Sequence, residues 1–337
     1  MQRFGMDHVN NSRRTVAFGV AAVFALIATA PLPGSADAAS YPTRPVRIIV
    51  PYGAGGIADV TMRMVAEKLS DKLGQQFIID NRPGAAGIVG IKAVVTSPPD
   101  GYTLAMIGGG LTAAKALFRS LPYDLERDLI PISTTAAYSV VVATGANSQL
   151  KSVKDVIETA KKNPGKLNFG AINPGSNQHL AGELFKSLAG ISVTTIPFKT
   201  TPELVTAAMR GDIDLLFEYQ AGLQGQLADR QIIAIATTGR ERAPSLPDVP
   251  TVMESGLPDY EVTSWNALAA PAGTPTEIVT LLNQAVNDAL NTPEVKAAAT
   301  RFGMDARGSS VEDLRERIKQ EVAKWAKVVE AAGIEKK

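Results

Sequence analysis

The chain has 337 residues, and its 34 lysines and arginines nearly balance its 33 aspartates and glutamates. This balance offers no basic surface for nucleic acid or for an anionic membrane, so neither is expected as a partner. The absence of cysteine excludes disulfides, a thiol nucleophile and a lipid-modified cysteine, and two histidines are too few for a multi-histidine metal site.

An apparent export signal opens the chain. Two arginines precede the apolar run 16–27, and small residues follow at 36–38, which is the order of regions in a cleavable secretory signal. The run is too short for a permanent membrane-spanning helix, so an anchor is less favoured than cleavage after Ala38 or Ala39. Residues 1–38 are therefore predicted to be a signal peptide, exported unfolded rather than by the twin-arginine route, and the mature protein to lie free in the periplasm.

Apolar periodicity predicts the order strand, helix, strand, helix, strand behind this signal. The elements are expected at 46–50, 57–73, 76–80, 87–96 and 102–107. In the first helix Val65, Leu69 and Leu73 recur on one face, and Gly74 ends the periodic pattern. A βαβαβ order predicts a parallel sheet with helices on its faces.

A glycine-rich loop joins the first of these strands to the first helix. Glycine lets a backbone approach a ligand closely, and the first amides of a helix lack intrahelical acceptors and carry the positive end of the helix dipole. The loop is therefore expected to hold a small anion, with Asp59 stabilising the first helical turn rather than acting as an acid or base. The residues predicted to line this part of the site are Tyr52, Gly53, Ala54, Gly55, Gly56, Ile57 and Asp59.

A second stretch repeats the α/β pattern, in agreement with two domains for about three hundred mature residues. Helices are predicted at 152–162, 177–189 and 202–210, and strands at 167–170, 192–196, 213–217 and 231–237. A loop with Asn173, Gly175 and Ser176 precedes the helix at 177–189. Ligands of open parallel sheets bind beyond the carboxyl ends of the strands, so the two glycine-containing loops are expected to face one cleft.

The C-terminal part of the chain adds two crossing strands and two helices. After the proline-rich loop 243–250 the pattern predicts a short helix, an extended run at 260–270, a turn at 271–275, and helices near 275–290 and 310–332. These last two helices lack a sheet of their own, so they are expected to return to the first unit. The predicted crossing strands are 140–143 and 262–269.

Asn177 and His179 stand in the first turn of the helix that follows the second loop. His179 can donate to a ligand oxygen or tie the loop to its own helix, and the sequence favours neither role. Because His8 leaves with the signal peptide, a Ser-His-Asp triad has His179 as its single candidate imidazole.

Many blocks of residues, in order along the whole mature chain, match one protein family. They include Gly55-Gly56 with Asp59, RPVRIIVP at 44–51, NRPGAAG at 81–87, PDGYTL at 99–104, HLAGELF at 179–185, LPDVPTV at 246–252 and APAGTP at 270–275. In these blocks the chain resembles the substrate-binding proteins of tripartite tricarboxylate transporters, the Bug family of periplasmic receptors.

The resemblance implies an α/β, two-lobed periplasmic-binding-protein fold, type II-like, whose two parallel or mixed sheets are flanked by helices and joined by crossing strands. It places a discontinuous lobe 1 at 39–141 and 260–337, and lobe 2 at 142–259. It further implies a monomeric receptor without catalytic residues, metal or cofactor, which closes around a small organic carboxylate held largely by backbone amides and ordered waters. The closed form is expected to dock on membrane subunits of a tripartite tricarboxylate transporter, or on a sensor.

Three places depart from the family pattern and bear on the ligand. Three glycines stand at 108–110, where a serine or threonine is usual, while Phe198 replaces a commoner tyrosine and the pair Glu218-Tyr219 replaces a commoner Asp-Asn. Aromatic acids thereby become as reasonable as citrate-like ones, and the hypothesis is an aromatic or dicarboxylic acid. The predicted contacts outside the first loop are Gly109, Gly110, Asn173, Gly175, Ser176, Asn177, His179, Phe198, Glu218 and Tyr219.

An alternative interpretation makes the protein an exported NAD(P)-dependent oxidoreductase. Residues 53–58 fit the dinucleotide fingerprint G-x-G-x-x-[GA], and Asp80 ends the second strand near the expected ribose-binding distance. Pro51 and Tyr52, however, separate the strand from the glycines where the fingerprint requires an immediate turn. Exported proteins also meet little free dinucleotide, so the family resemblance outweighs this motif.

Overall fold

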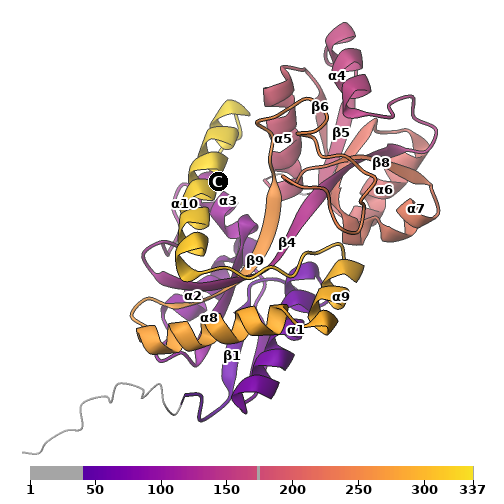
Figure 1. Cartoon of the computed structure of the whole chain (residues 1–337). Helices are drawn as coiled ribbons and strands as arrows, with labels where there is room; N and C mark the ends of the chain where they lie inside the picture. Colours follow the sequence, from indigo (N-terminus) through magenta and orange to yellow (C-terminus); the bar gives the residue numbers. More distant parts are fainter. Residues whose placement is uncertain (1–40, 173–174, 337) are drawn as a thin grey trace, which may run out of the picture. The chain divides into compact units, whose positions relative to one another are not determined.

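Three parallel strands form the first part of the sheet in a computed structural model that describes residues 41–172 and 175–336 (Figure 1). They lie in the order β2 (Phe77–Asn81), β1 (Val46–Val50) and β3 (Thr103–Gly108). Helices α1 (Ile57–Leu73) and α2 (Ile88–Val95) connect them, with the 3₁₀ turn η2 (Ala85–Gly87) before α2. Both pairings of β1 are parallel, so the predicted βαβαβ arrangement is confirmed. The predicted signal peptide lies outside the described residues.

Both faces of β1 and β3 are covered, which explains why β3 and most of β1 are buried. In β1, Val46, Ile48 and Val50 pack into one core with α1, whereas Ile49 belongs to a core on the opposite face with α2. Helix α8 (Thr276–Leu290) lies beside α1 in the first of these cores (Figure 1). The predicted return of this helix to the first unit is confirmed.

A second group of parallel strands follows, with helices of its own. The strands lie in the order β7 (Leu215–Tyr219), β5 (Asn168–Ile172) and β6 (Thr194–Phe198). The helices of this group are α4 (Val153–Lys162), α5 (Asn177–Ala189), α6 (Thr201–Arg210), the 3₁₀ turn η3 (Gln220–Gly222) and the short α7 (Gln224–Ala228). Strands β6 and β7 begin two residues later than the sequence predicts.

Two antiparallel strands cross between the groups. Strand β4 (Leu129–Gly145) pairs with β9 (Thr263–Pro271) along residues 129–139, and then with β7 and β8 (Ile232–Thr237) from residue 140 onward. Strand β9 also pairs with β3. Both predicted crossing strands are confirmed, but β4 is much longer than predicted. The sequence does not predict its first half, because the buried serine and threonine side chains there give little apolar signal.

The sequence does not predict helices α3 (Gly109–Leu117) and α9 (Pro293–Arg301). Helix α3 begins with two glycines, which have low helix propensity, and it is stabilised by packing against α10 (Val311–Ala331). Tertiary contacts therefore decide its conformation.

The prediction of a short helix after the proline-rich loop is wrong, because residues 251–256 form no helix and are mostly in turns. Thr251 and Glu254 do exchange hydrogen bonds as at a helix N-terminus: the Thr251 amide donates to Glu254 Oε2 at 2.7 Å, and the Glu254 amide to Thr251 Oγ1 at 3.0 Å. Gly256 then adopts φ 109°, and the helical path ends after one turn.

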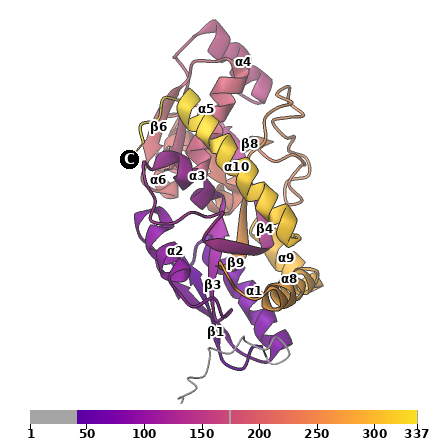
Figure 2. The same cartoon turned by 90° about the vertical axis from the view of Figure 1, so that its left-hand side faces the viewer.

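Helix α10 contacts elements of both strand groups (Figure 2). Near its start, Leu314 and Ile318 belong to the core that contains α2. Near its end, Trp325 and Val328 belong to the core that contains α4 and α5. The predicted lobe limits stay a prediction. Helix α10 contributes residues to both cores, as does α3 through Leu111 and Ala113. Within the described part of the chain, no helix combines the length and apolar character needed to cross a bilayer.

Candidate functional site

The first glycine loop leads from β1 into the N-terminus of α1, as predicted. Gly53, Ala54, Gly55 and Gly56 are exposed, and Gly55 adopts φ 82°, which favours glycine. Gly56 is the N-cap of α1 and provides no side-chain cap. Amides in the first turn of α1 are therefore available to an anion.

Asp59 fixes the shape of this loop. Its Oδ2 accepts hydrogen bonds from the Gly55 amide at 2.8 Å and from Arg63 Nε at 2.9 Å, and its Oδ1 accepts from Asn81 Nδ2 at 3.0 Å. Burial opposes ionisation of Asp59, but these hydrogen bonds prevail and lower its pKa. The same Asn81 amide also donates to the Tyr52 carbonyl at 3.1 Å, so both ends of the loop are held.

The glycine run at the start of α3 allows three close approaches. A β-carbon on Gly108 would lie 2.5 Å from the Trp265 carbonyl oxygen, and one on Gly109 would lie 2.8 Å from Asn177 Nδ2. A β-carbon on Gly110 would lie 2.8 Å from the Tyr52 hydroxyl oxygen. The missing side chains thus bring α3 against β9, the start of α5 and the first glycine loop.

The second loop is capped by its own residues at the N-terminus of α5. Ser176 Oγ accepts a hydrogen bond from the His179 amide at 3.1 Å, and His179 Nδ1 accepts one from the Gly175 amide at 3.1 Å. Gly175 has φ 88° and packs against Leu117 of α3. Asn173 lies outside the described residues.

The protonation state of His179 agrees with this geometry. Nδ1 can accept a hydrogen bond only in the neutral imidazole. Burial lowers the pKa of His179, although the nearby Glu183 carboxylate opposes the shift. The contacts support the loop-tying role, and a ligand contact by His179 stays a prediction.

Glu218 is buried and is occupied by protein donors. Its Oε1 accepts from Gln178 Nε2 at 2.9 Å and from the Tyr219 amide at 2.7 Å, and its Oε2 accepts from the Thr201 hydroxyl at 2.8 Å. Burial raises the pKa of Glu218, while the three hydrogen bonds lower it by less. Glu218 therefore joins the end of β7 to the starts of α5 and α6.

Polar side chains from both strand groups meet at the crossing strands. Asn177 Nδ2 and the Tyr219 hydroxyl both donate to Ser264 Oγ, at 2.9 and 3.2 Å. Tyr138 packs edge to face on Tyr219 with 5.1 Å between ring centroids, and its hydroxyl donates to Asn266 Oδ1 at 3.0 Å. We call Tyr52, Gly109, Gly110, Asn177, Tyr219 and Ser264 the junction cluster.

The sequence does not predict Ser264 or Tyr138 as site residues. Both lie on crossing strands, where they are paired directly across β4 and β9. Their hydroxyl groups, on the strands that cross between the two groups, are the signal that could have identified them. Burial raises the pKa of Tyr52 to about 12, so the hydroxyls of the cluster stay protonated near neutral pH.

The structure does not bring Phe198 to the junction cluster. Phe198 lies in an apolar core with Leu204 and Ile213, beside Gly170. Its predicted ligand contact has no support in this geometry. The described histidine, aspartate and glutamate side chains form no group of three or more that could hold a metal ion.

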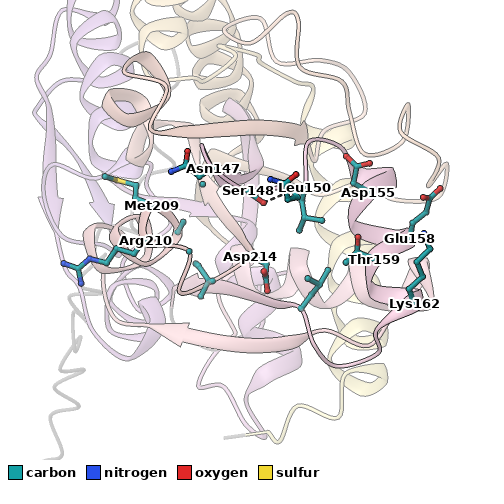
Figure 3. Close-up of a pocket in the computed structure, with 16 residues that line it drawn as sticks. Asn147, Ser148, Leu150, Asp155, Glu158, Thr159, Lys162, Met209, Arg210 and Asp214 are labelled. Carbon is teal, nitrogen blue, oxygen red and sulfur yellow. Dashed lines mark hydrogen bonds between the residues drawn. The ribbon is translucent and has the colours of Figure 1, made fainter.

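Two surface cavities lie away from the glycine loops. One of about 530 Å³ lies at the amino ends of β5 and β7, and Figure 3 shows Asp155, Glu158 and Lys162 of α4 at its edge. Another, of about 260 Å³, is lined by Tyr138 and by the loop 239–244. Neither lining includes a residue of the two glycine loops, so the candidate site is defined by the contacts of the junction cluster.

Comparisons with known proteins identify the family. Residues 61–334 match the model of the tripartite tricarboxylate transporter family receptor. Protein BugT of Bordetella pertussis is 32% identical over 327 residues, which cover 96% of this chain and 99% of that protein.

Solved structures agree with this match. An R. palustris protein solved with adipate is 34% identical with a TM-score of 0.76, covering 88% of this chain and all of that one. MatC from Rhodopseudomonas palustris, solved with bound malate, is 29% identical with a TM-score of 0.71, covering 86% of this chain and 100% of that one. The chain belongs to the tripartite tricarboxylate transporter receptor family, whose members are periplasmic solute-binding receptors and not enzymes.

Proposed function

We propose that this receptor captures a small carboxylate between its two glycine loops and delivers it to the membrane subunits of a tripartite tricarboxylate transporter. The observation that carries the proposal is the meeting of three helix N-termini, those of α1, α3 and α5, through the contacts of Tyr52 with Gly110 and of Asn177 with Gly109. Helix N-termini favour negative charge through their free amides and their dipoles.

The side chains of the junction cluster carry hydroxyl and amide groups and no formal charge. A carboxylate bound there would be held by neutral donors and by backbone amides, and charge-assisted hydrogen bonds of this kind are about twice as strong as neutral ones. Closure that excludes water strengthens them further. The adipate and malate in the two R. palustris proteins support a dicarboxylate, and the Tyr138–Tyr219 pair supports an aromatic acid equally.

The structure and the family argue against the oxidoreductase alternative. Its motif required Asp80 for a ribose, but the Asp80 carboxylate is paired with Arg82 at 2.9 Å and lies 3.9 Å from Arg47. Membership of a receptor family supports our inference that the loop at 53–58 serves solute binding rather than dinucleotide binding.

The finer features of the receptor are part of the same proposal. Residues 1–38 are removed after Ala38 or Ala39, and the mature protein is a monomer with lobes at 39–141 plus 260–337 and at 142–259. Mass spectrometry of the protein released from the periplasm checks the cleavage site, and light scattering checks the monomer.

Thermal unfolding of the mature protein tests the function directly. Citrate, C4 to C6 dicarboxylates, benzoate-type acids and NAD(P)H are added separately, because a ligand that binds the folded state raises the midpoint by mass action. A rise with one class of carboxylate supports the receptor and selects its ligand class. A rise only with NAD(P)H, or with an uncharged sugar used as a control, contradicts the proposal.

A further inference from the structure

The side-chain amide of Asn177 is buried and only half satisfied. Asn177 is 5% exposed, its Nδ2 donates to Ser264 Oγ at 2.9 Å, and its Oδ1 has no hydrogen-bond partner among the residues that the structure describes. A buried acceptor without a partner costs free energy, so such an atom in a native protein calls for an explanation.

The nitrogen of this amide lies on the side of β9. Ser264 Oγ accepts hydrogen bonds from Asn177 Nδ2 and from the Tyr219 hydroxyl. The nitrogen also lies 2.8 Å from the position of a β-carbon on Gly109, at the first turn of α3. The side chain of Asn177 therefore lies where the N-termini of α3 and α5 meet.

The position of the Asn177 amide depends on the absence of a side chain at Gly109. A serine or threonine at this position would put a β-carbon and a hydroxyl group into the space that the Asn177 amide fills. In this chain the amide of Asn177 takes that space and contributes an acceptor, which backbone amides and helix dipoles do not provide.

We propose that Asn177 Oδ1 accepts a hydrogen bond from a hydroxyl or amino group on the ligand, so that the receptor prefers hydroxy- or amino-substituted carboxylic acids to unsubstituted acids of the same length. The inference rests on the proposed function. The donors of the junction bind any carboxylate alike, whereas the Asn177 oxygen distinguishes the two members of such a pair. An unsubstituted acid leaves this oxygen buried and unpaired, and the substituted acid satisfies it.

Calorimetric titration with matched acids tests the preference. The pairs are succinate and malate, adipate and 2-hydroxyadipate, and phenylacetate and mandelate, with each enantiomer used separately. In the class that binds, one enantiomer of the hydroxy acid is expected to bind about tenfold more tightly than its unsubstituted partner, the effect of one net hydrogen bond. Asn177→Leu, which keeps the approximate volume and removes the oxygen, is expected to bring the affinities of the two acids of a pair within about twofold of each other.

Two further variants keep the result interpretable. Asn163→Leu makes the same chemical change at an exposed residue that ends α4, and the wild-type ratio should be retained. Gly109→Ser displaces the Asn177 amide without changing it, so the ratio should also fall, and this variant decides the matter if Asn177→Leu does not fold.

The outcomes separate the two proposals. If no carboxylate of the thermal scan and neither acid of any pair binds the wild-type protein, the carboxylate receptor itself is refuted and this inference falls with it. If both acids of a pair bind equally well, or if the preference survives in both Asn177→Leu and Gly109→Ser, the inference about Asn177 alone is overturned.

Discussion

The side chain of Gln178 donates a hydrogen bond to the carboxylate of Glu218 at 2.9 Å, which joins the first turn of α5 to the end of β7. The Tyr219 amide and the Thr201 hydroxyl donate to the same carboxylate. One buried side chain thus positions the starts of two helices beside the junction cluster.

Glu218→Gln is expected to stabilise the protein at neutral pH. Burial raises the pKa of Glu218 above its usual 4.5, so the folded state binds the proton more tightly than the unfolded state. The stability that protonation provides is complete below pH 4.5 and is lost as the pH rises through the folded pKa. The thermal midpoint of the variant should therefore exceed that of the wild type by a margin that grows from pH 4.5 to pH 8.

Glu218→Ala serves as the contrast. It leaves three donors without an acceptor, each at a cost of about 1–3 kcal/mol, so it should lower the midpoint at every pH. A midpoint of Glu218→Gln that falls relative to the wild type as the pH rises contradicts the assignment.

Gly108→Ala is expected to destabilise the fold by about 1–3 kcal/mol in chemical denaturation. Its new β-carbon would lie 2.5 Å from a backbone oxygen of β9, which cannot move like the end of a flexible side chain. Gly225→Ala is the matched control, because nothing lies within 4 Å of that β-carbon and the glycine is in a helix. The control should stabilise by up to about 1 kcal/mol, and equal destabilisation of both variants would contradict the close approach.

The His179 imidazole is expected to titrate below its usual 6.5, because burial favours the neutral ring. With the signal peptide removed, His179 is the single histidine of the sequence, so its C–H proton resonances need no assignment. A group whose folded pKa is depressed contributes stability above its unfolded pKa and loses it as the pH falls. His179 should therefore contribute a drop in the thermal midpoint from pH 7 to pH 5, measured as the difference from a variant that does not titrate.

His179→Asn should flatten that drop, since its Oδ1 can still accept from the Gly175 amide and does not titrate in this range. Retention of the full drop in this variant, or a measured pKa above 6.5, would show that the imidazole is not held as a neutral acceptor.

Asp59→Asn is expected to weaken binding of the acid selected in the thermal scan and to destabilise the protein by about 1–3 kcal/mol. An asparagine side chain accepts hydrogen bonds at one oxygen atom. The two carboxylate oxygens of Asp59 accept hydrogen bonds from Gly55, Arg63 and Asn81. Arg63→Gln removes the exposed partner of the same ion pair and should cost under about 1 kcal/mol. Unchanged affinity in Asp59→Asn would remove the first glycine loop from the binding site.

Local sequence patterns predict the elements that local forces decide. In α1, Val65 and Leu69 are fully buried as the helical period predicts, and Gly74 ends the helix with φ 69°. The two glycine loops are likewise visible, because glycine and capping residues act on their own neighbours. Helix α3 cannot be predicted from the local sequence, because its packing against α10 outweighs the low helix propensity of its glycines.

The missing part of the site depends on strand register. Tyr138 and Ser264 meet because β4 and β9 pair with Tyr138 opposite Ser264, and Tyr219 joins them because β7 places it opposite Val140. These pairings link residues more than seventy positions apart, and two register shifts in β4 alter which side chains share a face. No local pattern contains that information.

Helix α10 acts as a mechanical tie between the halves of the receptor. Its first turns are anchored in one core and its last turns in the other, so a swing about β4 and β9 must bend the helix or pull one end out of its apolar contacts. Wide opening therefore carries an energetic penalty that narrow opening avoids. We therefore expect this receptor to exchange its solute through a narrow opening rather than a wide one.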